Sequence, residues 1–347
     1  MMFCWRYLCT TLAVLLAISA GLVVRLSSVP KNLDIVLNDT SRHQFSISLL
    51  NDAQVETYRR DGVVLVTGLL DQKQVGKLRR EALATTGQSW TLFDWLVSER
   101  YSKIAFDVWR TDLTCASLSL QNLPQLAAQL LPNNPQLRLL RDAFFAYTSG
   151  GKGCGWHVDD SGFWPTKEDT SGVTVWIALD EMRVSKGGGL AVANMSLAGE
   201  WVEHCRAEVR AKGTCEMEEK SPDCHAKLED IKLQWDMKPG DAILWDRWTF
   251  HRTVPSINAS EGQTKSRYSI RYVPSDATAA GAIHPTVQKG SLLESPYYPQ
   301  VWPHLLDHET EALRQGLDSD VSVQRVLQGV LRVLLQIIRN KLPTGVL

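Results

Sequence analysis

Between residues 141 and 273 short apolar runs alternate with turns, and this pattern limits the chain to a β-rich fold. The turns are rich in Gly, Pro, Asn and Asp, and no helical repeat separates most of the runs. Several short strands in succession are typical of a sandwich or a closed barrel. The runs with strand character cover 143–148, 173–179, 189–192, 242–245 and 268–273.

Helices with a buried strand between them are expected before this region. Asn and Asp are good helix N-caps, and Gly commonly ends a helix. The expected elements are a helix from Asn51 or Asp52 to Gly62, a strand at 63–66, a helix from near Asp71 to Gly87 with Val75, Leu78 and Ala82 on one face, and helical residues at 120–140 broken by prolines.

An uncharged apolar run at 7–24 predicts a targeting signal. A helix of this length reaches about 27 Å, which just spans a bilayer. The run can equally be a signal peptide cleaved near Ser19-Ala20, because signal peptidase accepts small residues there. Either reading predicts the secretory pathway, as a single-pass membrane or luminal protein of the endoplasmic reticulum or Golgi, or a plastid where the host has one. Sequons at Asn38, Asn194 and Asn258 are compatible with a lumen.

Three of the seven cysteines, Cys205, Cys215 and Cys224, lie in one polar stretch. In an oxidising lumen two of them can pair and staple a surface insertion, which is the preferred reading. A zinc site with His204 and His225 is the alternative, although the spacings match no compact zinc finger.

The predicted organisation has four parts, and the charge balance bears on its partners. Lys and Arg number 37 against 38 Asp and Glu, without a basic patch, so nucleic acid is not an expected partner. The parts are 1–28, a signal anchor or signal peptide; 29–44, a linker; 45–290, an enzyme domain with an insertion at about 199–232; and 291–347, a helical extension in which 321–338 repeats aliphatic residues at helical spacing.

The chemistry is concentrated first in the segment 155–160, which reads Gly-Trp-His-Val-Asp-Asp. In a strand, residues two apart point to the same face, so His157 and Asp159 can bind one ion together. A second histidine from elsewhere would complete the two-histidine, one-carboxylate set that holds non-haem Fe(II) and leaves positions open. His-x-Asp alone is a weak signal.

A second region strengthens that reading. Residues 240–251 form a turn, an apolar strand and then His251, expected at the far end of the strand. Sixteen residues later Arg267 and Ser269 share one face of another strand and can bind a carboxylate with a guanidinium and a hydroxyl. A metal triad followed by such a clamp is what a 2-oxo dicarboxylate cosubstrate requires.

From about Ser48 to Tyr272 the sequence resembles the phytanoyl-CoA dioxygenases, in the stretches 58–66 and 175–180, the His157-Val158-Asp159 motif and the later histidine and arginine. The resemblance implies a mainly β fold with flanking α-helices, a double-stranded β-helix of the jelly-roll, cupin-like kind. It implies Fe(II), with 2-oxoglutarate and O2 as cosubstrates. The implied residues are His157, Asp159 and His251 as iron ligands and catalytic residues, Arg267 on the distal carboxylate of 2-oxoglutarate, and Thr253 and Trp176 beside that cosubstrate.

Two features depart from the family pattern. The stretch 193–196 lacks the usual Pro-Gly-Ser-His turn, and the interval from His251 to Arg267 is longer than usual. Arg252 and Arg271 are therefore rival clamps, and Arg271 would share a strand face with Arg267.

The predicted function is an Fe(II)- and 2-oxoglutarate-dependent oxygenase acting on an unidentified small-molecule or lipid substrate. Halogenases of this fold replace the carboxylate ligand with a small residue, so Asp159 favours hydroxylation or desaturation. The C-terminal Gly-Val-Leu is no peroxisomal signal. The alternatives are a catalytically silent metal-binding jelly roll that acts as a luminal binding or scaffold protein, and a jelly roll that uses zinc or manganese for other chemistry.

Overall fold

The computed structural model describes residues 45–86, 103–133, 135–148, 153–159, 164–212, 215–256, 264–280, 287 and 289–315. Among these residues, no helix combines the length and apolar character needed to cross a membrane. The apolar run at 7–24, the linker at 29–44 and the aliphatic repeat at 321–338 lie outside the described residues, so they stay predictions.

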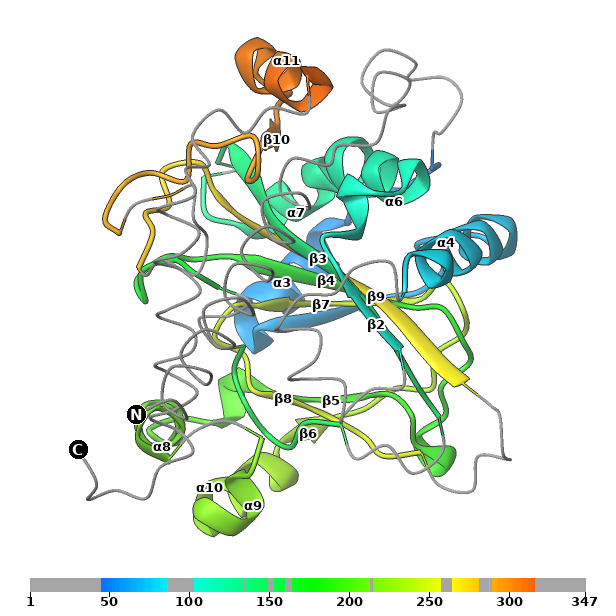
Figure 1. Ribbon diagram of the computed structural model, residues 1–347. Helices are drawn as coiled ribbons and strands as arrows, with labels where there is room; N and C mark the ends of the chain where they lie inside the picture. Colours follow the sequence, from blue (N-terminus) through cyan, green and yellow to red (C-terminus); the bar gives the residue numbers. More distant parts are fainter. Residues whose placement is uncertain are drawn as a thin grey trace, which may run out of the picture.

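Antiparallel strands form the body of the molecule, and helices flank them (Figure 1). The strands are β1 (Val63–Val66), β2 (Lys103–Phe106), β3 (Leu137–Thr148), β4 (Val173–Ala178), β5 (Leu190–Ala193), β6 (Lys232–Leu233), β7 (Ala242–Asp246), β8 (His251–Thr253), β9 (Thr264–Pro274) and β10 (Gln300–Trp302). The helices are α3 (Asp52–Asp61), α4 (Gln72–Thr85), α6 (Leu113–Ser117), α7 (Pro124–Leu130), α8 (Trp201–Lys212), α9 (Met217–Lys220), α10 (Pro222–Asp230) and α11 (Asp307–Gln315), with short turns η1 (Val108–Arg110), η2 (Leu118–Asn122), η3 (Val184–Lys186) and η4 (Met195–Leu197).

Two sheets face each other. The larger, seven-stranded sheet has the order β1-β7-β4-β9-β3-β10, with β2 also paired to β3, and the smaller has the order β6-β5-β8. Both are antiparallel, and the chain passes between them several times, as in a jelly roll. The mainly β, jelly-roll prediction is confirmed.

Alternation along the strands gives each sheet two different faces. On β4, Val175 and Ile177 belong to the core shared with α3, α4, α6 and α7, whereas Trp176 and Ala178 belong to the cluster between the sheets. Side chains at even positions of β4 and odd positions of β9 therefore point into the interior of the jelly roll. The functional residues lie on this interior face.

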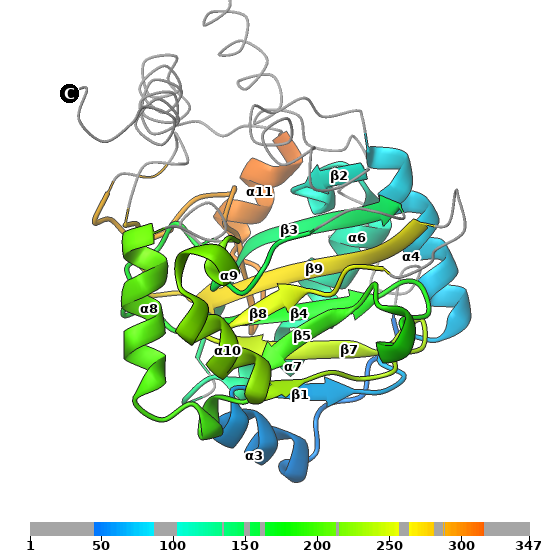
Figure 2. The ribbon, with the colours of Figure 1, turned by 90° about the horizontal axis from the view of Figure 1, so that it is seen from below.

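The segment between β5 and β6 forms the outer layer below the smaller sheet, where α8, α9 and α10 lie in front of β5 and β8 (Figure 2). Ala191 and Ala193 of β5 share an apolar cluster with Leu228 of α10 and with Trp156. A disulfide between Cys205 and Cys224 joins α8 to α10. The predicted pairing of two cysteines in this stretch is confirmed.

Local sequence explains the elements before the sheets. Asn51 and Asp71 cap α3 and α4, each in a capping box with the Gln three residues later. Gly62 ends α3 in the left-handed conformation, at φ 74°. Both helices were predicted at these positions, although the α4 segment ends at Thr85 and Gly87 lies outside the described residues.

Two predicted boundaries are wrong. The region 120–140 is helical only to Leu130, and β3 begins at Leu137, because Leu137 and Leu139 fill the helix-side core while β3 pairs with β9 along its length. The segment after 290 is not purely helical, since β10 pairs with β3 at the edge of the larger sheet before α11 begins.

Candidate functional site

His157 and His251 lie directly opposite each other on paired backbone segments. The His157 N–H donates to the His251 carbonyl at 3.0 Å, and the His251 N–H donates to the His157 carbonyl at 2.9 Å. His157 therefore makes an isolated β-bridge and does not lie in the predicted strand. The segment is nevertheless extended, because Trp156 and Val158 pack outward against the α8–α10 layer while His157 and Asp159 converge inside.

His251 was predicted at the far end of the apolar strand, but it begins the next strand. β7 ends at Asp246, whose carboxylate accepts the Trp248 N–H at 2.9 Å and whose carbonyl accepts the Thr249 N–H at 2.9 Å. This turn carries the chain from the larger sheet into β8 of the smaller one. His251 consequently faces the interior from the sheet opposite β7.

Hydrogen bonds on the two imidazoles leave one nitrogen of each available to a metal. The His157 Nδ1 bonds the Gly155 carbonyl at 2.7 Å, and the His251 Nδ1 bonds the Thr249 carbonyl at 3.0 Å. Because a carbonyl can only accept, each Nδ1 carries the proton and each Nε2 keeps its lone pair. The ring centroids are 4.3 Å apart.

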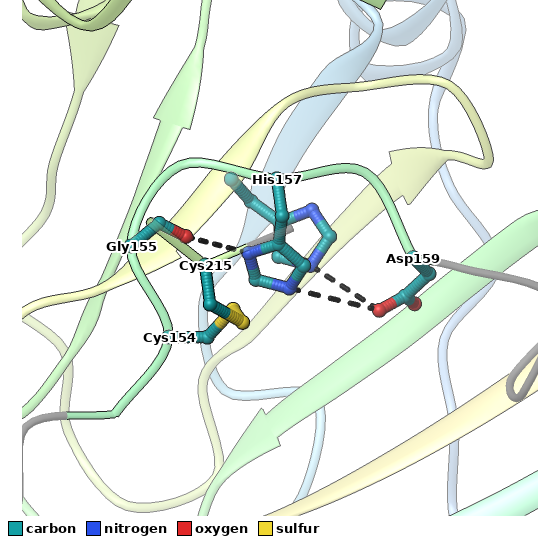
Figure 3. Close-up of a disulfide and its surroundings, with 6 residues drawn as sticks. Cys154, Gly155, His157, Asp159 and Cys215 are labelled. Atoms are coloured by element: carbon teal, nitrogen blue, oxygen red, sulfur yellow. Dashed lines mark hydrogen bonds and ion pairs between the residues drawn. A yellow bond between two sulfur atoms is a disulfide. The ribbon is translucent and has the colours of Figure 1, made fainter. Parts of the chain in front are cut away.

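Asp159 supplies an oxygen to the same point. Its Oδ1 lies 3.9 Å from the Nε2 of His157 and 3.6 Å from the Nε2 of His251. In Figure 3 His157 stands between Asp159 and a disulfide. Two imidazole nitrogens and one carboxylate oxygen facing a common centre form a group that could hold a metal ion.

The other oxygen of Asp159 is held by Arg271 of β9. Nε and Nη2 of Arg271 both lie 2.8 Å from Oδ2, and the Trp164 indole N–H approaches it at 3.4 Å. Burial acts to raise the pKa of Asp159, but the charge of Arg271 acts in the opposite direction, and the pKa falls below its usual value. Burial, and then the neighbouring His251, lowers the pKa of His157 to about 3. Near neutral pH the triad thus holds an anion and a neutral imidazole, as metal binding requires.

Sheet register separates the three rival arginines. Arg271 is level with Trp245 and binds Asp159, so it belongs to the metal end of β9. Arg267 lies four residues away, about 13 Å along the strand. Arg252 points outward from β8 and binds Glu229. Arg267 is therefore the arginine placed to hold the far end of a molecule that reaches from the triad.

Arg267, Ser269 and Trp176 are brought together as predicted. Ser269 pairs with Trp176 across β9 and β4, and the Arg267 guanidinium carbon lies 5.9 Å from the Trp176 ring centroid and 5.0 Å from that of Phe145. Thr253 lies apart from them on β8, buried on the same face as His251. Its side chain packs so closely against Gly153 that a Cβ on residue 153 would clash with it.

A disulfide between Cys154 and Cys215 was not predicted. It links the segment just before His157 to the turn after α8, and its Cα atoms are 4.6 Å apart. The two partners are separated by 61 positions in the sequence, and no local pattern indicates the pairing. Because all three cysteines of the polar stretch are in disulfides, the alternative of a zinc site there is wrong.

A family model described as phytanoyl-CoA dioxygenase (PhyH) matches residues 58–262, more than half of the chain. The chain belongs to the phytanoyl-CoA dioxygenase family. As a member of this family, the protein is a 2-oxoglutarate-dependent dioxygenase. Its cofactor is Fe(II), and its cosubstrates are 2-oxoglutarate and O2.

Solved structures share its fold. The non-haem α-ketoglutarate-dependent epimerase SnoN from nogalamycin biosynthesis is 18% identical, with a TM-score of 0.55, over 72% of this chain and 97% of that chain. The carbocyclase SnoK from the same biosynthesis is 17% identical, with a TM-score of 0.50, over 72% of this chain and 96% of that chain. No curated protein matches the sequence significantly. At these identities the structural likeness shows the fold alone.

The interior of this family member fits both the metal and the cosubstrate. Among the described residues, the Ser269 hydroxyl and the Trp176 indole N–H are buried without a hydrogen-bond partner. Buried polar atoms normally have partners, so these two atoms indicate a place for a polar ligand. They lie between the triad and Arg267, where 2-oxoglutarate would extend.

Proposed function

We propose that His157, Asp159 and His251 hold Fe(II), and that Arg267 and Ser269 bind the distal carboxylate of 2-oxoglutarate. The observation that carries this proposal is the convergence of two Nε2 lone pairs and one carboxylate oxygen on a common centre. Thr253 and Trp176 complete the proposed cosubstrate pocket. The reaction is hydroxylation of a small molecule or lipid, with release of succinate and CO2.

The chain's own residues orient and protect this chemistry. Iron, 2-oxoglutarate and O2 would supply the oxidising power when they are bound. Carbonyls of Gly155 and Thr249 fix the two imidazole rings, and Arg271 fixes the carboxylate so that Oδ1 faces the metal position. Apolar side chains between the sheets, among them Met182, Val192 and Ile243, exclude water from this interior.

The assignment of the clamp predicts a specific change in 2-oxoglutarate binding. Arg267→Met removes a charge-assisted hydrogen bond to the cosubstrate, so KM for 2-oxoglutarate should rise about 10- to 100-fold. The affinity for the metal should stay the same, because Arg267 lies four residues along β9 from Arg271, the residue that binds Asp159. Succinate release at varied 2-oxoglutarate measures the first quantity, and a titration with Mn(II) measures the second.

Lys265→Met is the matched control, because it removes a cation from the same face of β9 where Lys265 binds the exposed Glu181 carbonyl. It should leave KM for 2-oxoglutarate unchanged. An unchanged KM in Arg267→Met would refute the clamp. A metal-loaded wild-type protein that neither binds 2-oxoglutarate nor releases succinate would instead favour a catalytically silent binding module.

We further propose that the protein works in an oxidising compartment of the secretory pathway. Two disulfides within the described residues support this location, since such bonds are rare in the cytosol. The sequon at Asn194 is partly exposed between β5 and α8. The full chain expressed in eukaryotic cells should migrate faster in gel electrophoresis after its N-glycans are removed. Of the five cysteines in the described residues, only Cys115 should have a free thiol. An unglycosylated protein with these five cysteines reduced would contradict the location.

A further inference from the structure

Glu229, near the end of α10, gathers donors from both metal-ligand segments. Its Oε1 accepts the Trp156 indole N–H at 2.7 Å and the Arg252 Nε at 2.6 Å, and its Oε2 lies 3.2 Å from the Arg252 Nη2. Lys232 adds a contact at 2.6 Å. Burial acts to raise the pKa of Glu229, but these hydrogen bonds outweigh it and lower the pKa to about 2. The group is therefore an anion under all ordinary conditions.

The two main donors are the immediate neighbours of the metal-binding histidines. Trp156 precedes His157, and Arg252 follows His251. In extended backbone, neighbouring side chains point to opposite faces. Glu229 thus binds Trp156 and Arg252 on the outer face of the two paired segments, and the imidazoles of His157 and His251 lie on the inner face. The Arg252 guanidinium also lies 5.5 Å from the Trp156 ring centroid, so the two donors contact each other.

Backbone hydrogen bonds also join these two segments. They include the pair between His157 and His251 and one from the Thr253 N–H to the Cys154 carbonyl at 2.9 Å. The segment 153–159 is not part of either sheet. Side-chain contacts on the outer face therefore act together with these bonds to set its distance and angle relative to β8.

We infer that Glu229 is a positioning residue of the metal site, which clasps Trp156 and Arg252 and so sets the separation of His157 and His251. This inference rests on the proposed iron ligands and adds a residue from the α8–α10 layer to the site. A purely structural role, fastening α10 to the body, is the competing explanation. That role is already served by Leu228, which is buried in one apolar cluster with Ala191 and Ala193 of β5, while the Cys205–Cys224 disulfide joins α10 to α8.

The test compares Glu229→Gln with Asp230→Asn. Asp230 is the exposed next residue of α10, so both changes remove one negative charge from the same helix end. Co(II) is the probe, because its visible spectrum reports ligand geometry and its binding needs no turnover. Loss of a residue that helps to orient metal ligands typically weakens binding 10- to 100-fold, and we expect a loss in that range in Glu229→Gln, together with an altered Co(II) spectrum. Asp230→Asn should match the wild type in both.

A second comparison separates positioning from fold stability. Because Glu229 and Arg252 share one contact, the double variant Glu229→Gln/Arg252→Gln should lose less Co(II) affinity than the two single variants lose together, since coupled losses do not add. Co(II) affinity within twofold of wild type and an unchanged spectrum in Glu229→Gln would overturn the inference. A weakened affinity that Asp230→Asn shares would overturn it too. Failure of the wild-type protein to bind Co(II) would instead refute the proposed metal site itself.

Discussion

Asp159→Ala is expected to eliminate both metal binding and succinate release, and to destabilise the fold as well. The change removes Oδ1, the carboxylate oxygen that faces both Nε2 atoms, so metal affinity should fall by more than the roughly 100-fold that loss of an outer partner can cost. It also leaves Arg271 as a buried charge without its carboxylate, where both side chains are 4% exposed. Breaking such a pair costs about 3–5 kcal/mol of the free energy of unfolding.

The two effects can be separated by a second change. The double variant Asp159→Ala/Arg271→Met replaces the buried cation with an apolar side chain, so it should recover most of the lost stability in urea unfolding of the metal-free protein. Metal binding should stay lost, because the carboxylate ligand is still missing. If Asp159→Ala retains wild-type Mn(II) affinity, Asp159 is not a ligand.

Glu309→Ala should cost a similar free energy far from the triad. Glu309 of α11 bonds the Arg138 Nη1 at 2.6 Å and accepts the Gln300 N–H of β10 at 2.8 Å. The side chains of Arg138 and Glu309 are 3% and 2% exposed. The alanine variant therefore leaves the buried Arg138 cation without its carboxylate and the Gln300 N–H without its acceptor. We expect a loss of about 3–5 kcal/mol in urea unfolding.

A matched variant shows whether the stranded charge causes that loss. Arg138→Met/Glu309→Leu removes both charges and keeps apolar volume, so it should lie much nearer the wild type than Glu309→Ala does. A double variant as unstable as the single one would mean that the pair contributes by its own attraction. A loss below about 1 kcal/mol in Glu309→Ala would show that the pair behaves as an exposed one does.

Much of this fold can be predicted from the sequence, because the signals for many of its helices and strands come from residues close together in the chain. The caps at Asn51 and Asp71 and the short apolar run at 173–178 depend on neighbours in the chain. Strands β8 and β10 have only three residues each, too few for a period to be visible. Their pairing is decided by partners far away in sequence, so His251 could not be assigned to the smaller sheet beforehand.

The site divides in the same way. The two-residue spacing of His157 and Asp159 predicts their convergence even though the segment is a loop with one bridge, because extended backbone alternates in either case. The sequence alone could not decide whether Arg267 or Arg271 is the clamp, since residues four apart share a strand face. Only the tertiary pairing of Arg271 with Asp159 distinguishes them. Glu229 was equally invisible, because its partners lie 73 and 23 residues away.

The most direct test of the central claim is the visible charge-transfer band that forms when 2-oxoglutarate chelates iron in the absence of oxygen. Residues 29–347, loaded with Fe(II) and 2-oxoglutarate anaerobically, should show the band. His157→Ala should abolish it, and Arg267→Met should require more 2-oxoglutarate to reach the same intensity. No band from folded protein with confirmed iron content would contradict the cosubstrate assignment, and a full band in His157→Ala would contradict the proposed triad.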